Sequence, residues 1–349
     1  MNTYLASTAQ VNDWLHTVAQ SADLLWPQPL GQGNFSFRPV AATTAFDLHR
    51  YRPSVVPPGR YLLPADETLF TYRRGPEGDI HYQPPDSPER LILAGVRPCD
   101  LKGIAELDAV MADAPADPLY LDRRAATAII AVACVAPCDS RCFCAAAGSL
   151  DFRAGADICL TPLAAGVLVE VLSEEGDELL AGAALAPCAD GEKRRREAEA
   201  ARPVPFGRAL AAPPAELPAL LRRATRSPVF ARHGERCFSC GTCNLVCPTC
   251  YCFEVRDDMA LDGASGRRSR TWDSCMIPGF AEVAGGHNFR ARVGERQRHR
   301  LKRKFEYLPE RFGLGSFCVG CGRCGRQCTA DIDILVMMNE IVAEAGGAA

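Results

Sequence analysis

The sequence predicts two units of different fold, a mixed α/β domain in the N-terminal half and a mainly α-helical domain at the C-terminal end. Three observations predict this division. Short apolar runs alternate with helical patterns up to about residue 189, a stretch rich in proline and charge covers residues 190–232, and two dense cysteine runs lie beyond it. We therefore expect an α/β domain at residues 1–189, a linker at 190–232 and a second domain at 233–349.

The overall composition limits the class of protein. With 349 residues and 48% hydrophobic content, the chain can form two domains with a sizeable core, and its net charge of −3 argues against nucleic acid as a partner. The first twenty residues show neither a basic region nor an apolar signal segment, and no run approaches eighteen apolar residues. We therefore expect a cytoplasmic protein without a membrane span, in which eighteen cysteines indicate metal or redox chemistry.

The N-terminal domain begins with an amphipathic helix in residues 4–24, with Ser7 or Thr8 as its cap. Strand-like pieces follow at residues 60–63 and 68–72, separated by prolines. The apolar runs at 91–96 and 127–133 are typical of buried strands, and 166–172 reads as a strand before a helix at 174–180. This succession predicts an open α/β sheet.

Five cysteines follow the two buried strands. Cys99 comes after the first strand, and the second is followed by Cys134, Cys138, Cys142 and Cys144. Because ligands gather at the carboxyl ends of neighbouring strands in open α/β sheets, these thiols predict a third metal site in the N-terminal domain, apart from the C-terminal runs. Buried structural thiols are the alternative, and we expect this for the isolated Cys159 and Cys188.

The two C-terminal runs share the spacing C-x2-C-x2-C-x3-C, which holds cubane 4Fe-4S clusters. Three thiolates on a tight loop each reach a different iron, and in two-cluster ferredoxins the fourth ligates the other cluster. The second domain is therefore expected to be ferredoxin-like, with the two ligand sets Cys237, Cys240, Cys243, Cys328 and Cys318, Cys321, Cys324, Cys247. Zinc is the alternative, but zinc knuckles usually contribute two cysteines each rather than four in one run.

An insertion of 70 residues, 248–317, separates the two runs. It contains Cys250, Cys252 and Cys275, and then a basic run at 290–304. That run reads as a solvated helix, as compensation for the negative charge of clusters, or as a docking site for an acidic partner. Beyond the last cysteine, residues 332–345 carry an apolar helical face that we expect to cap the cluster domain.

Several motifs together resemble a known family. They are Gly95-Val-Arg-Pro-Cys-Asp100, Cys142-Phe-Cys144, the segment from Cys237 to Cys252, Trp272-Asp-Ser-Cys275 and Cys318-Val-Gly-Cys-Gly-Arg-Cys324. The chain resembles the iron–sulfur beta subunits of cytoplasmic sulfhydrogenases and NAD(P)-linked nickel–iron hydrogenases, and the corresponding 4Fe-4S subunit of anaerobic sulfite reductase. The resemblance implies an electron-transfer subunit between a terminal hydrogenase or sulfite reductase module and a flavin-containing, NAD(P)H-oxidising subunit.

The same resemblance implies Cys99, Cys134, Cys142 and Cys144 as the third ligand set, which leaves Cys138 outside it. We thus predict three 4Fe-4S clusters, and a fourth if Cys250, Cys252 and Cys275 bind one with a further ligand. No catalytic residue and no dinucleotide fingerprint are found. Two other functions stay open, a flavin-binding oxidoreductase in its own right and a zinc-binding structural protein.

Overall fold

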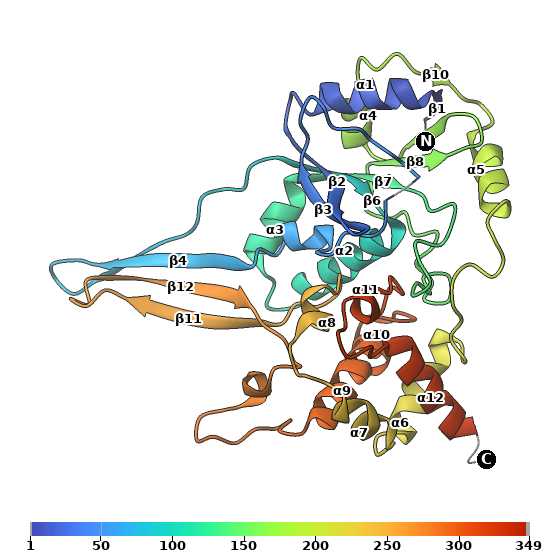
Figure 1. Cartoon of the computed structure of the whole chain (residues 1–349). Helices are drawn as coiled ribbons and strands as arrows, with labels where there is room; N and C mark the ends of the chain where they lie inside the picture. The colour runs from blue at the N-terminus through green and yellow to red at the C-terminus, as the bar shows by residue number, and fades with distance from the viewer. Residues whose placement is uncertain (1, 50, 347–349) are drawn as a thin grey trace.

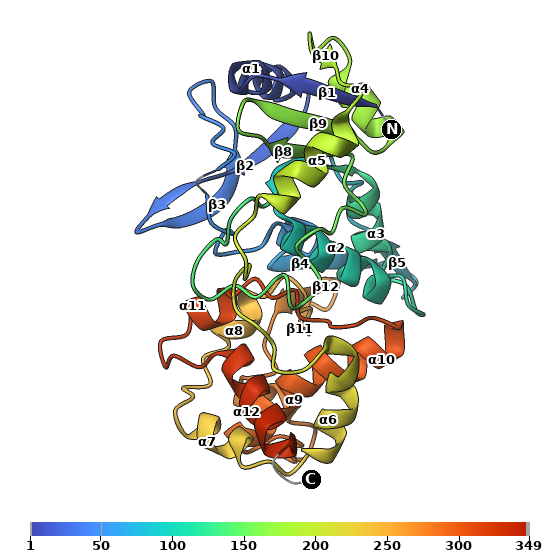
Figure 2. The ribbon, with the colours of Figure 1, turned by 90° about the vertical axis from the view of Figure 1, so that its right-hand side faces the viewer.

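The computed structural model describes residues 2–49 and 51–346. It shows an α/β unit stacked on a helical unit, with a long β arm at the side of the molecule (Figures 1 and 2). The mixed α/β character predicted for the N-terminal region is confirmed. Among the described residues, no helix is long and apolar enough to cross a lipid bilayer.

The main sheet has eight strands within the described residues, in the order β10-β1-β9-β8-β7-β6-β2-β3. The strands are β1 (Thr3–Ala6), β2 (Asp23–Gly31), β3 (Asn34–Pro39), β6 (Leu91–Val96), β7 (Thr127–Val132), β8 (Ile158–Pro162), β9 (Val167–Val171) and β10 (Ala186–Pro187). The central strands β2, β6, β7 and β8 are parallel, and the outer pairs are antiparallel. The strands predicted at 91–96 and 127–133 are therefore confirmed as parallel neighbours.

Helices cover both faces of this sheet. On one face, α1 (Thr8–Val18) buries Leu15 against Ile92, while α4 (Glu174–Leu180) contributes to the same cluster. On the other face, α2 (Pro98–Met111) and α3 (Pro118–Ala125) pack against the alternate strand residues. Of the two predicted caps, Ser7 and Thr8, it is Ser7 that caps α1, in a capping box with Gln10. The helix is shorter than the predicted 4–24, because its two ends belong to the strands β1 and β2.

The strand predicted at residues 60–63 is wrong. The chain forms a single 3-10 turn there, η1 (Pro58–Tyr61), because Pro58 at the first position favours a helical start and cannot donate to a sheet. The turn places Leu62 and Leu63 in the core beneath α2. The predicted strand at 68–72 lies within β4 (Asp66–Arg74).

A second sheet joins the two halves of the sequence. Its order is β11-β12-β4-β5, in which β5 (Ile80–Gln83) and β4 come from the N-terminal region, whereas β11 (Phe253–Met259) and β12 (Ser265–Trp272) come from the insertion. Arg270 forms buried ion pairs with Glu67, at 2.5 Å, and with Asp117. The insertion is thus tied to the N-terminal unit by strand pairing and by charge, and its strands β11 and β12 lie beside β4 in the arm of Figure 1.

The segment 190–232, predicted to be a linker, contains regular structure. Its first helix, α5 (Gly191–Ala200), is held to the main sheet by the ion pair of Arg195 with the fully buried Glu170, at 3.3 Å. After η2 (Pro214–Glu216), α6 (Leu217–Arg223) and α7 (Val229–Glu235) contribute Leu217 and Phe230 to the C-terminal core. The irregular crossing between the two units is therefore confined to residues 201–213.

The C-terminal unit is mainly helical. Its further elements are α8 (Thr242–Leu245), η3 (Pro278–Ala281), α9 (Val293–Lys302), η4 (Arg303–Tyr307, a π-helical turn), α10 (Leu308–Phe312), α11 (Arg323–Arg326) and α12 (Ile334–Gly346). In α12, Leu335, Met338 and Ile341 are buried in the core of this unit. The capping helix predicted from the C-terminal pattern is thus confirmed.

Candidate metal centres

The five N-terminal cysteines meet at one end of the main sheet. Cys99 begins α2 directly after β6, and Cys134 follows the parallel neighbour β7, so the strand pairing brings the two chain segments together. Cys142 and Cys144 lie in the loop that follows. The Cys144 thiol donates to the sulfur of Cys142, which lowers the pKa of Cys142 to about 6 and raises that of Cys144. We call this set the N-terminal group.

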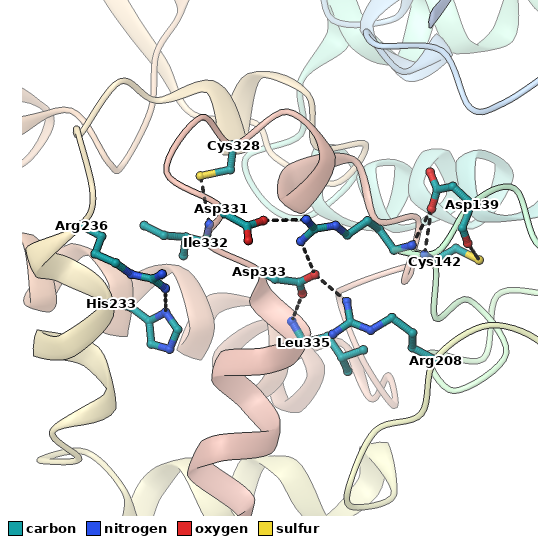
Figure 3. A network of polar contacts seen from close by, with 11 residues as sticks. Asp139, Cys142, Arg208, His233, Arg236, Cys328, Asp331, Ile332, Asp333 and Leu335 are labelled. Atoms are coloured by element: carbon teal, nitrogen blue, oxygen red, sulfur yellow. Dashed lines mark hydrogen bonds and ion pairs between the residues drawn. The ribbon is translucent and has the colours of Figure 1, made fainter. Parts of the chain in front are cut away.

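The two C-terminal cysteine runs cross over. Cys237, Cys240 and Cys243 line one cavity together with Cys328 from the second run, and we call these four the first group. The Cys328 sulfur accepts a hydrogen bond from the Ile332 amide at 3.3 Å (Figure 3). Such donors stabilise a thiolate. The structure therefore brings together the four thiols that the ferredoxin pattern predicts for one cube.

The second group consists of Cys318, Cys321 and Cys324 with Cys247. Burial, together with the charges of Cys321 and Cys247, raises the pKa of Cys324 to about 12, which reflects how closely these thiols lie. Gly320 and Gly322, between the ligands, have φ values of +67° and +73°. A residue with a Cβ is disfavoured in that conformation, so the two glycines allow the tight loop.

The N-terminal group lies directly against the second group. Cys99, Cys144 and Cys321 share one buried cluster, and the Phe143 amide donates to the Gly320 carbonyl at 2.8 Å. The Ser149 hydroxyl donates to the Val319 carbonyl at 2.6 Å. The sequence suggested a third site apart from the other two, whereas the structure packs its loop onto the loop of the second group.

The remaining three cysteines, Cys250, Cys252 and Cys275, line a separate cavity of about 330 Å³. The Cys275 thiol donates to the Cys252 sulfur, which lowers the pKa of Cys252 to about 6 and raises that of Cys275. The side-chain amide of Asn244 donates to the Cys275 sulfur at 2.9 Å. The same Asn244 nitrogen lies 3.9 Å from the Cys252 sulfur, so these two thiols are close neighbours.

These groupings differ from a site for a single ion. A zinc ion with Zn–S bonds of about 2.3 Å would hold four sulfurs about 3.8 Å apart, whereas a cube spreads its thiolates over four irons. Among the described residues, no three His, Cys, Asp or Glu side chains converge in an arrangement for one metal ion.

Comparison with known proteins agrees with the cysteine pattern. A family model described as a 4Fe-4S dicluster domain matches residues 236–332. Sulfhydrogenase 2 subunit beta of Pyrococcus furiosus is 34% identical over 294 residues, which cover 83% of this chain and 84% of that protein. The chain belongs to this sulfhydrogenase beta-subunit family. It is therefore an iron–sulfur protein, as the resemblance predicted, and no solved structure matches it.

A buried cation stands beside the N-terminal group of this beta-subunit family member. The Arg97 guanidinium donates to the carbonyls of Ala133 and Tyr51, both at 3.2 Å, and lies 3.8 Å from the Tyr51 ring centre. Burial alone would lower the pKa of Arg97, but Tyr51 and Cys134 raise it above its usual value. Arg97 therefore stays charged and offsets the charge of neighbouring thiolates.

Part of the basic run 290–304 faces inward at the cluster motifs. Arg300 is only 4% exposed and Lys304 is 6% exposed. Burial alone would lower the pKa of Arg300, but the neighbouring sulfurs of Cys243 and Cys324 raise it. In the same way, Cys247 raises the pKa of Lys304. Of the three interpretations of this run, charge compensation fits these two side chains best.

A buried ion pair connects the ligand loops of the N-terminal and second groups. Asp100, next to Cys99, accepts a hydrogen bond from Arg323 at 2.8 Å, and a second oxygen–nitrogen contact of the pair measures 2.7 Å. Both side chains are at most 2% exposed. Arg323 stands between Cys321 and Cys324. No sequence pattern indicates this pair, because the two residues are far apart in the chain.

A polar network ties the N-terminal loop to the loop of Cys328 (Figure 3). The Asp139 carboxylate accepts a hydrogen bond from the Cys142 amide at 3.1 Å. The Arg141 guanidinium donates a hydrogen bond to the Asp333 carboxylate at 3.3 Å. Arg208, from the crossing segment, bonds the same Asp333 at 2.6 Å. Burial would raise the pKa of Asp333, but Arg208 and then Arg141 lower it overall. The three ligand groups are therefore held in one connected framework.

Proposed function

We propose that the chain binds three 4Fe-4S clusters, one in each of the three groups. The first is held by Cys237, Cys240, Cys243 and Cys328, the second by Cys318, Cys321, Cys324 and Cys247, and the third by Cys99, Cys134, Cys142 and Cys144. The proposal is supported by the convergence of each set and by the buried cations beside them. Cys138 lies in contact with Cys134, within reach of the third set.

We further propose that the subunit relays electrons along these groups. The observation that carries this proposal is their order in space. Cys243 of the first group lies near Cys247 of the second, and Cys321 of the second shares a buried cluster with Cys99 of the N-terminal group. Cys240, at one end of the row, is exposed to solvent. A row that reaches the surface suits electron exchange with another subunit.

The residues of this chain would each have a defined part. A 4Fe-4S cluster, when bound, accepts and donates single electrons. The thiolates hold it, and Arg97, Arg300 and Lys304 offset its negative charge from within the protein. The Asp100–Arg323 pair fixes the distance between two ligand loops. Burial of these cations and of the ion pair also influences the reduction potential of the neighbouring clusters.

As partners we propose a terminal redox subunit together with a flavin-containing, NAD(P)H-oxidising subunit, in the cytoplasm. The name of the Pyrococcus furiosus relative favours a hydrogenase over a sulfite reductase as the terminal subunit. Anoxic affinity purification from the native host should recover both subunits with the chain. Recovery of the chain alone would contradict this assignment.

The cluster count gives a direct test. The intact chain should contain about twelve irons, four for each cluster. Replacing Cys142 by serine should remove about one third of them, whereas Cys188→Ser, a buried thiol outside the groups, should remove none. Iron and acid-labile sulfide analysis after anoxic purification measures both. A wild-type content near eight, or an unchanged content in Cys142→Ser, would contradict the third cluster.

A further inference from the structure

A cavity of about 330 Å³ lies beside the cluster groups and is used by none of them. It is bordered by Cys250, Cys252, Cys275, His299, Arg303 and Lys304. Cavities of a few hundred cubic ångströms suit small molecules. Thiols, the three cations Arg300, Arg303 and Lys304, and aromatic walls from Tyr251 and Phe280 therefore meet in a space of ligand size.

The β11–β12 hairpin fixes the contact between two of these thiols. Cys252 directly precedes β11 and Cys275 follows β12, and the register pairs Phe253 with Trp272. The Asp273 amide continues this pairing by donating to the Cys252 carbonyl at 2.9 Å. The side-chain nitrogen of Asn244 lies 2.9 Å from the Cys275 sulfur and 3.9 Å from the Cys252 sulfur, so one amide group reaches both thiols. A disulfide between these neighbouring thiols would have an S–S bond of about 2.05 Å.

The two thiols differ in access. Cys252 is partly exposed, whereas Cys275 is only 5% exposed and its sulfur is held by Asn244. In thiol–disulfide exchange, an accessible thiolate attacks the substrate and a second, resolving thiol then displaces the product. The difference in exposure makes Cys252 the attacking thiol and Cys275 the resolving thiol. Asn244 is then a positioning residue for Cys275.

We propose that Cys252 and Cys275 form a redox-active dithiol, which reduces an anionic low-molecular-weight disulfide bound in the cavity. The Cys252 thiolate attacks one sulfur of the substrate, forms a mixed disulfide and releases the first thiolate product. Cys275 then attacks the Cys252 sulfur, releases the second thiolate and leaves a Cys252–Cys275 disulfide. The substrate gains two electrons and the two cysteines lose them. Two electrons, delivered one at a time by the iron–sulfur groups, and two protons from water then restore the dithiol, and this last part rests on the proposed function.

The charge of the cavity selects the substrate class. The partly exposed Arg303 guanidinium lies 5.2 Å from the Tyr251 ring centre and borders the cavity. Lys304 lies deeper and donates to the Thr249 carbonyl at 3.0 Å. Burial lowers the pKa of His299 to about 4, so this ring is neutral at pH 7. Arg303 is thus the group best placed to bind a substrate carboxylate.

The test uses the full chain, purified anoxically, with oxidised glutathione as the anionic probe and hydroxyethyl disulfide as the uncharged one. After incubation, free thiols are blocked in acid and the cysteines are mapped by mass spectrometry. Oxidised glutathione should produce the Cys252–Cys275 disulfide in the wild type and in Cys188→Ser, and a glutathione adduct on Cys252 in Cys275→Ser. Arg303→Gln should slow the reaction with oxidised glutathione about tenfold and leave hydroxyethyl disulfide unaffected.

Three results would overturn the proposal. They are absence of the disulfide in the wild type, an adduct on another cysteine in Cys275→Ser, and a loss of about four irons in Cys252→Ser, which would make these cysteines ligands of a fourth cluster. Mapping the wild type requires no variant, so a misfolded Cys252→Ser protein would not decide the matter. The exchange needs no electrons from clusters, and its failure is therefore distinct from a failure of the relay, which iron analysis reports.

Discussion

Replacing Gly320 by alanine should loosen the contact between the N-terminal and second groups. Gly320 has a φ of +67°, and a Cβ built there would lie 2.6 Å from the Phe143 carbonyl oxygen and 2.8 Å from the Cys144 Cα. The left-handed conformation costs an alanine about 1–2 kcal/mol, and overpacking against fixed backbone adds about 1–3 kcal/mol. The expected destabilisation is therefore about 2–5 kcal/mol.

Gly313 supplies the matched control. Its φ is +64°, but a Cβ there would meet nothing within 4 Å, so Gly313→Ala bears only the conformational cost of about 1–2 kcal/mol. The rate of cluster loss, followed by visible absorbance at a fixed elevated temperature without oxygen, compares the two variants. Each 1.4 kcal/mol corresponds to about tenfold in rate, so Gly320→Ala should lose its clusters about five- to hundredfold faster than Gly313→Ala. Equal rates would refute the proposed close packing of the two loops.

Two further predictions concern buried charge. Arg300→Met should make the reduction potential of the adjacent clusters more negative by tens of millivolts, because removal of a buried cation disfavours the reduced form. The control Arg298→Met, on the partly exposed side of α9, should change this potential far less. Equal shifts of the two variants in a redox titration would argue against charge compensation. Asp333 has a lowered pKa in the folded protein, so its ionised form stabilises the fold above the unfolded value, and this contribution is lost as the pH falls through the folded pKa. The Asp333→Asn variant should thus lose less stability than the wild type when the pH falls below about 4, and unfolding followed by tryptophan fluorescence measures this. If the variant lost as much stability as the wild type, the result would count against this role for Asp333.

Local patterns predicted the features that depend on neighbours in sequence. The spacing of the cysteine runs anticipated that Cys328 lies beside Cys237 and Cys243. Two apolar runs followed by cysteines anticipated that Cys99 and Cys134 meet at the ends of parallel strands. Both inferences rest on short-range geometry, a tight loop in one case and adjacent buried strands in the other.

Local sequence patterns could not predict contacts between residues that are far apart in the chain. The alternation in β4 indicates a strand but not that its partner is β12, about two hundred residues further on, and the Asp100–Arg323 pair leaves no periodic signal either. The basic run shows a different limit. A dense charge run is usually solvated, and only the thiolates opposite Arg300 and Lys304 make burial of these cations favourable.

The second sheet also governs the order of events during synthesis. The β4–β5 hairpin leaves the ribosome early, but Glu67 is 203 residues away from its partner Arg270. At about 5–20 residues per second, β4 waits roughly 10–40 seconds for β12. During that time it presents an unpaired edge, which is a site for aggregation. A chaperone that shields the unpaired edge of β4 would therefore favour a correctly matured subunit. Assembly of the clusters only after β4 has paired with β12 would have the same effect.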